Sequence, residues 1–142
     1  MTVTATHSSS LSIVDSDNPS ASVAIQRQST ETLDVLKGPS PGAIACNPTG
    51  VEPDLSELTL GGPVLIENQS STTDNDAIVG IWDGDSFFPL FDVPPGKTLK
   101  AWLSRFLGEE MTSGTGTVSS AGSLMIKMRV ESAVVVIYGY SS

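Results

Sequence analysis

The apolar residues of this chain gather in short runs of strand length, separated by clusters of Gly, Pro, Asn, Asp and Ser. The clearest unit is IVGIWDGDSFFPLF, residues 78–91, in which Asp83-Gly84 lies between two apolar stretches. An Asp-Gly pair between apolar strands is a strong hairpin signal, because the tight turn needs a positive φ that glycine adopts without steric cost. The pattern therefore predicts antiparallel β-structure.

Pro89 lies inside the returning apolar run. Proline has no N–H to donate to a neighbouring strand, so this strand is expected at a sheet edge or with a break at that point. Alternation predicts that Phe87 and Pro89 face one way. Phe88, Leu90 and Asp92 are then expected on the other face. Because apolar groups occupy both faces, we expect each face to be covered, one of them by another subunit.

Further strands are expected where apolar residues alternate or fill short bounded runs. These stretches are residues 11–14, 22–30, 32–36, 63–68, 77–82, 123–130 and 133–140. Two other stretches are ambiguous. Residues 98–107 fit a strand or a short helix, and the strand is favoured. Residues 54–60 fit a short helix capped by Asp54 or a strand, and the helix is slightly favoured because Glu57 takes the capping-box position.

Polar and Pro/Gly-rich stretches divide these runs. Residues 37–53 contain four prolines and three glycines, which excludes a helix and predicts a long loop with at most one short strand around Ile44. Residues 108–122 are expected to form a polar loop. The resulting fold is all-β, an antiparallel β-sandwich or jelly-roll-like barrel of about 8–10 short strands. We expect a flexible N-terminal arm over residues 1–10 and a single β-sandwich domain over residues 11–142.

Composition bounds the possible partners. The 142 residues carry a net charge of −9 with seven Lys or Arg, which argues against direct binding of a nucleic-acid backbone. No apolar run approaches the roughly 18 residues of a membrane helix, so no membrane partner is expected. The N-terminus has neither the basic nor the apolar segment of a secretory signal, which predicts synthesis in a cytoplasm.

Catalytic groups are difficult to assemble from this sequence, so we expect no enzyme, no catalytic residues and no cofactor. GPSPG, residues 38–42, matches the nucleophile-elbow pattern around Ser40, but the flanking prolines leave no room for the helix that must follow. The single histidine, His7, lies far upstream, and the single cysteine, Cys46, is expected to be a small buried side chain. One histidine and one cysteine also exclude ordinary zinc sites.

Three pairs of carboxylates are the remaining metal candidates: Asp15 and Asp17, Asp74 and Asp76, and Asp83 and Asp85. None continues into a calcium-loop pattern, so they are interpreted as solvated turn residues and no metal site is expected. The aromatic residues suit either a sugar-stacking platform or, as we favour, a core and a seam between subunits. They are Trp82, Phe87, Phe88, Phe91, Trp102, Tyr138 and Tyr140. Asn68-Gln69-Ser70 forms a glycosylation sequon that is interpreted as a chance match.

The segment from about Leu55 to Tyr140 resembles small all-β virion proteins of tailed bacteriophages. The pattern it shares with them consists of Gly62, Val64, Ile66 and Asn68, then Val79 to Ile81, Phe87 or Phe88 before Pro89-Leu90, Pro95-Gly96-Lys97, Leu99 to Leu103 and the terminal run Ala133 to Tyr140. These are mostly turn and core signals. The resemblance implies a structural protein of the virus particle, and the family lends no catalytic residues.

The function expected from this resemblance is that of a non-enzymatic capsid decoration (cement) protein, which binds the major capsid protein and stabilises the shell. The alternatives are a head–tail connector or tail accessory protein, and a carbohydrate- or receptor-binding β-module of the tail. The expected partners are further copies of the chain, as a trimer if it decorates a capsid, and another virion protein. The expected location is the virion.

Overall fold

The computed structural model describes residues 3–33, 40–55, 63–103, 110–113, 116–119 and 122–139. Within these ranges the regular structure consists of strands and one short 3-10 turn, Pro19–Ala21. Every strand pair is antiparallel. The predicted all-β antiparallel fold is confirmed. The chain divides into two compact units, Met1–Leu36 and Lys37–Ser141, which are described separately.

The first unit is a long hairpin of strands β1 (Val3–Ile13) and β2 (Val23–Leu33). The pairing is continuous from Val3 opposite Leu33 to Ile13 opposite Val23. The sequence predicts a flexible arm over residues 1–10 and short strands beyond it. Instead, β1 runs across that point, because neither strand contains a glycine or proline to interrupt it and residue pairs form along its whole length.

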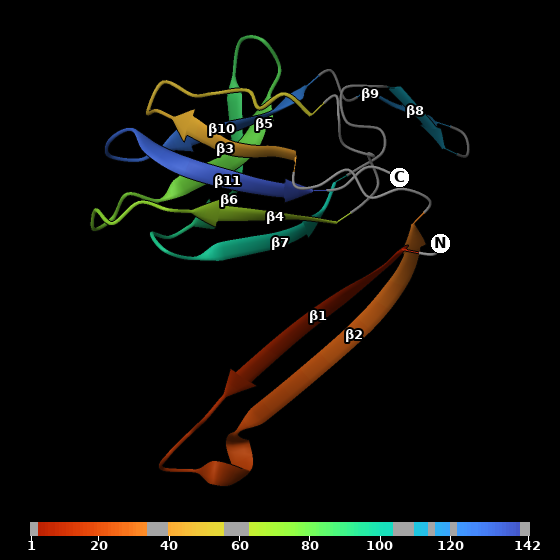
Figure 1. Cartoon of the computed structure of the whole chain (residues 1–142), viewed down its shortest axis with the longest axis vertical. Helices are drawn as coiled ribbons and strands as arrows, with labels where there is room; N and C mark the ends of the chain where they lie inside the picture. The colour runs from red at the N-terminus through yellow and green to blue at the C-terminus, as the bar shows by residue number, and fades with distance from the viewer. Residues whose placement is uncertain are drawn as a thin grey trace. The chain divides into compact units, whose positions relative to one another are not determined.

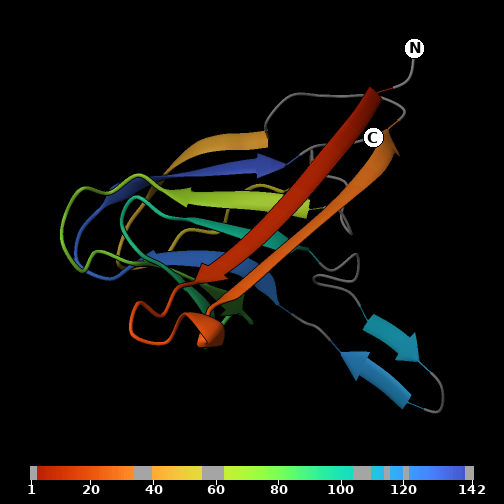
Figure 2. The same cartoon turned by 90° about the horizontal axis from the view of Figure 1, so that it is seen from below.

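The second unit is built mainly from two sheets, of four and three strands, and also contains a separate two-stranded hairpin (Figures 1 and 2). The strand order of the four-stranded sheet is β3 (Ser40–Cys46), β11 (Ala133–Gly139), β4 (Pro63–Asn68) and β7 (Thr98–Trp102). The strand order of the three-stranded sheet is β10 (Ser123–Met128), β5 (Ala77–Trp82) and β6 (Phe87–Val93). The two sheets pack face to face, which makes this unit a β-sandwich.

The core lies between the two sheets and draws on both. In β4, Val64 and Ile66 are buried while Leu65 between them is exposed, as period-two alternation requires. In the opposite sheet, Val79 and Ile126 fill the same layer. The buried core residues are Cys46, Val64, Ile66, Ala77, Val79, Val93, Leu124, Ile126, Met128, Val135 and Ile137.

Two stretches predicted as loops contain strands. Strand β3 lies inside the Pro/Gly-rich stretch 37–53, and the expectation of a short strand around Ile44 is confirmed. In the described sheet β3 pairs only with β11, and a proline such as Pro41 is tolerated on an edge strand because no second neighbour needs its N–H. The polar stretch 108–122 contains a small hairpin of β8 (Glu110–Ser113) and β9 (Gly116–Ser119).

The two ambiguous stretches differ in outcome. Residues 98–102 form β7, so the preference for a strand is confirmed there. Residues 56–60, most of the stretch in which a short helix was slightly favoured, lie outside the described residues. So do residues 104–107, the last part of the other ambiguous stretch.

Candidate interaction surface

The outward side of the four-stranded sheet carries large apolar side chains. Leu65, Trp102, Val134 and Tyr138 are each 38–50% exposed. Tyr138 lies opposite Leu65 on the neighbouring strand, and Leu65 lies opposite Lys100 on the next one. We call these five residues, from strands β4, β7 and β11, the outer face. They lie on the central strands and one edge strand of the sheet, and Glu67 lies on the same side, two residues from Leu65 and opposite Thr98. The apolar side chains of the outer face are therefore accompanied by one cation, Lys100, and by the neighbouring carboxylate of Glu67.

The sequence of β11 explains why this surface forms. Val135 and Ile137 point inward and are fully buried, so the residues between and beside them must point outward. Those outward residues are Val134, Val136 and Tyr138, which are apolar as well; Val136 is buried between its neighbours, whereas Val134 and Tyr138 are exposed. A strand that is apolar on both faces fits a sheet with cover on both sides. In the described part of the chain only the inward side is covered by a sheet.

Lys100 and Trp102 interact within the outer face. The Nζ atom of Lys100 lies 5.9 Å from the centroid of the Trp102 ring, which is the outer limit of a cation–π contact. The two residues are two apart on β7 and therefore share a side of the sheet. The outer face thus combines an exposed indole with a positive charge at its edge. Such a surface suits a partner with apolar groups.

Edge strand β6 presents a second exposed apolar region. Both predictions for Pro89 are confirmed: β6 is at the edge of its sheet, and its register with β5 shifts at this point. Pro89 pairs with Gly80 and Phe91 with Val79, so Leu90 is an extra residue in a β-bulge. Leu90 is 57% exposed.

The bulge corrects the predicted facing of this strand. Phe88, Leu90 and Asp92 were expected on one side. Instead, Phe91 lies opposite the core residue Val79, so it shares the core-facing side with Phe88, whereas Asp92 lies opposite Ile78 on the other side. The extra residue shifts the alternation by one position, which the sequence pattern alone does not reveal. Phe88 and Phe91 remain about half exposed because they belong to an edge strand.

The aromatic candidates are distributed over different sides of the sandwich. Trp82 pairs with Phe87 on the outward side of the three-stranded sheet, where the Nζ atom of Lys127 lies 4.9 Å from the centroid of the Phe87 ring. Trp102 and Tyr138 lie on the outward side of the opposite sheet. Tyr140 is outside the described residues. The described aromatic side chains are therefore not brought together into one sugar-stacking platform.

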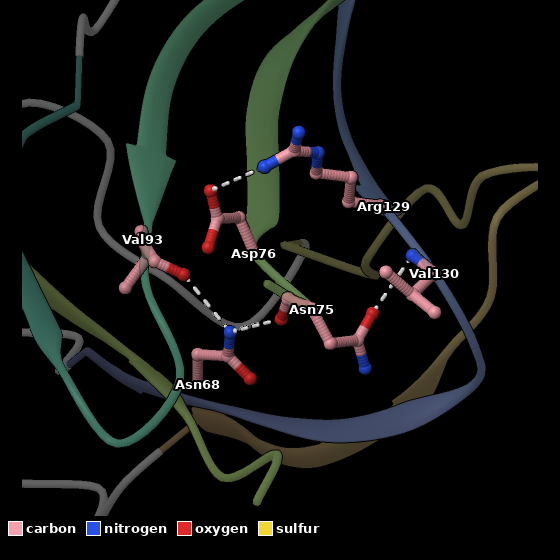
Figure 3. Close-up of polar contacts among 6 residues, drawn as sticks. All are labelled: Asn68, Asn75, Asp76, Val93, Arg129 and Val130. Carbon is pink, nitrogen blue, oxygen red and sulfur yellow. Dashed lines mark hydrogen bonds and ion pairs between the residues drawn. The ribbon is translucent and has the colours of Figure 1, made fainter. Parts of the chain in front are cut away.

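A buried polar cluster joins three loops at one end of the sandwich (Figure 3). The Nδ2 atom of Asn68 donates to the carbonyls of Asn75 and Val93, each at 2.9 Å. The Oδ1 atom of Asn75 accepts from the backbone N–H groups of Val130 and Glu131 at 2.9 and 3.1 Å. Both asparagines are fully buried. Their bonds fix the loops that follow β4, β6 and β10, which gives the cluster a structural role.

Asn68, the asparagine of the glycosylation sequon, belongs to this buried cluster. The amide nitrogen of Asn68 is committed to two hydrogen bonds inside the protein, and its Oδ1 atom accepts from the N–H of Ser70 at 3.0 Å. A fully buried amide is inaccessible to a glycan-transferring enzyme in the folded state. Asn68 is therefore a loop-fixing residue in this chain.

In two of the three carboxylate pairs, the first aspartate accepts hydrogen bonds from backbone N–H groups of its turn, and in the remaining pair Asp76 lies near an arginine. The Oδ1 atom of Asp15 accepts from the N–H groups of Asp17 and Asn18, each at 3.0 Å. The Oδ2 atom of Asp76 lies 3.7 Å from Nη1 of Arg129. Across the described ranges, no group of three or more His, Cys, Asp or Glu side chains is placed to hold a metal ion.

The third pair caps the β5–β6 turn. Asp83 Oδ1 accepts from the N–H groups of Ser86 and Asp85 at 2.7 and 2.9 Å. These hydrogen bonds, that from Ser86 foremost, hold the pKa of the Asp83 carboxyl below its usual value because they stabilise the charged form. Gly84 has a φ of +97°, so the predicted turn glycine is confirmed.

Two of the three nucleophile and base candidates, Ser40 and Cys46, lie at opposite ends of one strand, and the third belongs to the other unit. Ser40 opens strand β3, which continues to Cys46, so no helix follows Ser40 as a nucleophile elbow requires. Cys46 belongs to the core, and burial raises the pKa of its thiol to about 11. His7 belongs to strand β1 of the other unit, opposite Ser29.

Comparison with known proteins adds no relative. No protein-family model matches the chain, and neither does any curated protein or solved structure. Among the described residues, no helix has the length and apolar character that a membrane crossing demands. The function therefore has to be argued from the surface chemistry of the chain.

Proposed function

We propose that this chain is a non-enzymatic structural protein of a tailed-bacteriophage particle, a decoration protein that binds the capsid shell through the outer face. The observation that carries the proposal is the exposed apolar surface formed by Leu65, Trp102, Val134 and Tyr138. Large exposed apolar patches on small proteins mark interaction sites. Aromatic residues are also enriched among those that dominate binding energy.

The resemblance to small phage virion proteins supports the same proposal, since the segment from about Leu55 to Tyr140 includes every strand of the sandwich except β3. The charge of the chain fits a protein partner: a net charge of −9 disfavours close approach to nucleic acid packaged inside a shell. The proposed partners are the major capsid protein and other copies of this chain. The proposed location is the virion, after synthesis in the host cytoplasm.

A second candidate function is a receptor- or carbohydrate-binding module of the tail. The exposed Trp102 beside Lys100 favours it, because an exposed indole is a common stacking surface for sugars. A glycan array separates the two candidates. Binding of one glycan class that is lost in Trp102→Ala would favour the tail module over the decoration protein.

The decisive experiment uses particles that lack this protein and purified protein added back to them. The wild type is expected to bind the shell, and Trp102→Ala combined with Tyr138→Ala is expected to weaken binding by about a hundredfold, because two central aromatic anchors are removed. Leu90→Ala is the matched control, since Leu90 is also exposed and apolar but lies on the edge of the other sheet. Absence of the protein from purified particles, or cryo-electron microscopy that places it only in the tail, would overturn the decoration role.

A further inference from the structure

The two faces of the β1–β2 hairpin have opposite chemistry near its closed end. Leu11 pairs with Ile25, and Ile13 pairs with Val23, so side-chain alternation places all four residues on one face. Each of the four is 43–54% exposed. We call these four residues the hairpin patch. At the same level, the opposite face carries Ser10, Ser12, Ala24 and Gln26.

A hairpin of this kind needs cover. An isolated two-stranded ribbon is marginally stable in water, and packing of its apolar face against another sheet or a helix is what stabilises it. Large apolar residues face each other across β1 and β2 in the hairpin patch, and also at the open end, where Val3 is paired with Leu33. The seryl and glutaminyl groups of the opposite face suit contact with water. The hairpin therefore has one face adapted for docking and one adapted for solvent.

Charges of opposite sign follow the hairpin patch at its two ends. Arg27 lies on the same face as Ile25, two residues further toward the open end of the hairpin. Asp15 lies two residues beyond Ile13 toward the closed end. At about 3.4 Å per residue, Arg27 is about 7 Å beyond the patch along β2, whereas Asp15 lies in the turn that follows β1. A two-fold axis through the centre of the patch would place Arg27 of one copy over Asp15 of another.

We propose that a second copy of this chain covers the hairpin patch. The two patches pack face to face with the hairpins antiparallel, and Arg27 of each copy lies beside Asp15 of the other. Such a contact is self-complementary, as a two-fold interface must be. The Asp15 carboxylate is already held in place by the N–H groups of Asp17 and Asn18. Arg27 uses Nη1 to reach the carbonyl of Gln26, and a guanidinium has further N–H groups for a carboxylate.

The size of the hairpin sets the strength of this contact. Strands of 11 residues extend about 37 Å, and two strands are about 10 Å wide. The area of one hairpin face is therefore well below the roughly 800 Å² per partner of a standard stable interface. We therefore expect a weak, concentration-dependent dimer in dilute solution. We rest this inference on the proposed function, in which copies of the chain assemble on a particle. Copies held close together there would form the contact at high effective concentration.

The test is sedimentation equilibrium of the full chain at protein concentrations up to about 1 mM, where contacts with millimolar Kd become visible. The wild type is expected to associate. Ile25→Ser is expected to weaken association about tenfold or more, since an apolar anchor at the centre of the contact is lost. Ala24→Ser is the matched control on the opposite face and is expected to associate like the wild type. A monomeric wild type, or equal association of the two variants, would overturn the proposal.

Charge reversal tests the antiparallel arrangement. Arg27→Asp and Asp15→Arg are each expected to weaken self-association about tenfold, because each homodimer then contains two like-charged contacts. An equimolar mixture of the two variants is expected to regain association, since each contact between them joins opposite charges. A mixture that associates no better than its components would overturn the arrangement. Circular dichroism of each variant verifies that the hairpin is intact, because Asp15 also caps the turn.

These outcomes are separate from those of the proposed function. If the wild type is monomeric at every concentration but is found on purified capsids, the hairpin proposal fails and the decoration role stands. If the wild type dimerises through the hairpin patch and is absent from particles, the decoration role fails and the hairpin contact stands.

Discussion

The side-chain amide of Asn68 donates a hydrogen bond of 2.9 Å to the carbonyl of Asn75, and both residues are fully buried. Asn68→Ala would remove this bond, the bond to Val93 and the acceptor for the N–H of Ser70. We expect a loss of about 2–4 kcal/mol in the free energy of unfolding, because buried backbone groups lose their partners. Urea denaturation measures this loss.

Gln69→Ala is the control for that prediction, since Gln69 is the exposed neighbour of Asn68. Its side chain bonds only to the Glu67 carboxylate in the described structure. We expect this variant to unfold within about 0.5 kcal/mol of the wild type, as exposed substitutions usually do. An equal loss in the two variants would show that the Asn68 cluster is not a source of stability.

The two glycines of the β5–β6 hairpin are predicted to respond differently to the same substitution. A Cβ at Gly80 would lie 2.2 Å from the carbonyl oxygen of Phe88, whereas a Cβ at Gly84 would meet no atom within 4 Å. Gly80→Ala is therefore expected to cost about 2–4 kcal/mol through overpacking against backbone. Gly84→Ala is expected to cost about 1–2 kcal/mol, through its positive φ alone. Thermal and urea unfolding compare the two, and a greater loss at Gly84 would contradict the prediction.

Asp83 is predicted to stabilise the β5–β6 turn only while it is charged. Its folded-state pKa lies below the ordinary value of 3.8, so its contribution is present at neutral pH and is lost as the pH falls through the folded-state pKa. Asp83→Ala is expected to lower the melting temperature at neutral pH and to lose that difference in strong acid. Asp83→Asn is expected to melt between the wild type and Asp83→Ala at neutral pH, because it keeps the Oδ1 acceptor but lacks the charge. Calcium is expected to shift the melting temperature of none of the three proteins.

Cys46 is predicted to be unreactive in the folded protein. Its pKa is raised from 9.0 to about 11 by burial, so the folded state keeps the thiol proton where an unfolded chain would release it. The contribution of the Cys46 thiol to the free energy of unfolding is therefore expected to be lost as the pH rises from about 9 to about 11. Cys46→Ala is expected to remove that part of the pH dependence. A thiol reagent should modify native Cys46 no faster than the protein unfolds, and rapid labelling would contradict its burial.

Local sequence was sufficient to identify the strands of the sandwich. Val64 and Ile66 alternate with Leu65, and the strand at 63–68 was predicted with its observed bounds. Pro89 correctly indicated an edge strand with a break, because the missing N–H is a property of that residue alone. The phage-particle role and the absence of catalysis remain predictions, since they depend on partners and activities outside the chain.

The interaction surfaces were predicted less well. An apolar strand at 133–140 indicated a second cover, but the sequence did not show that Leu65, Lys100 and Tyr138 would lie side by side. Their neighbourhood depends on the strand order β3-β11-β4-β7, which joins segments far apart along the chain. The β1–β2 pairing was missed for a similar reason. Ser and Thr between residues 3 and 12 give little apolar alternation, and this segment forms a strand through its pairing with β2.

The sequence by itself determined that this chain forms antiparallel strands, because side-chain alternation and turn residues act over a few neighbouring positions. Only the tertiary structure decided which strands pair and in which register. The bulge at Leu90 turns Phe91 toward the core side. Asn68 donates hydrogen bonds to the carbonyls of Asn75 and Val93. Both features arise from contacts between separate segments, since a register or a buried hydrogen bond is fixed only when its partner is in place.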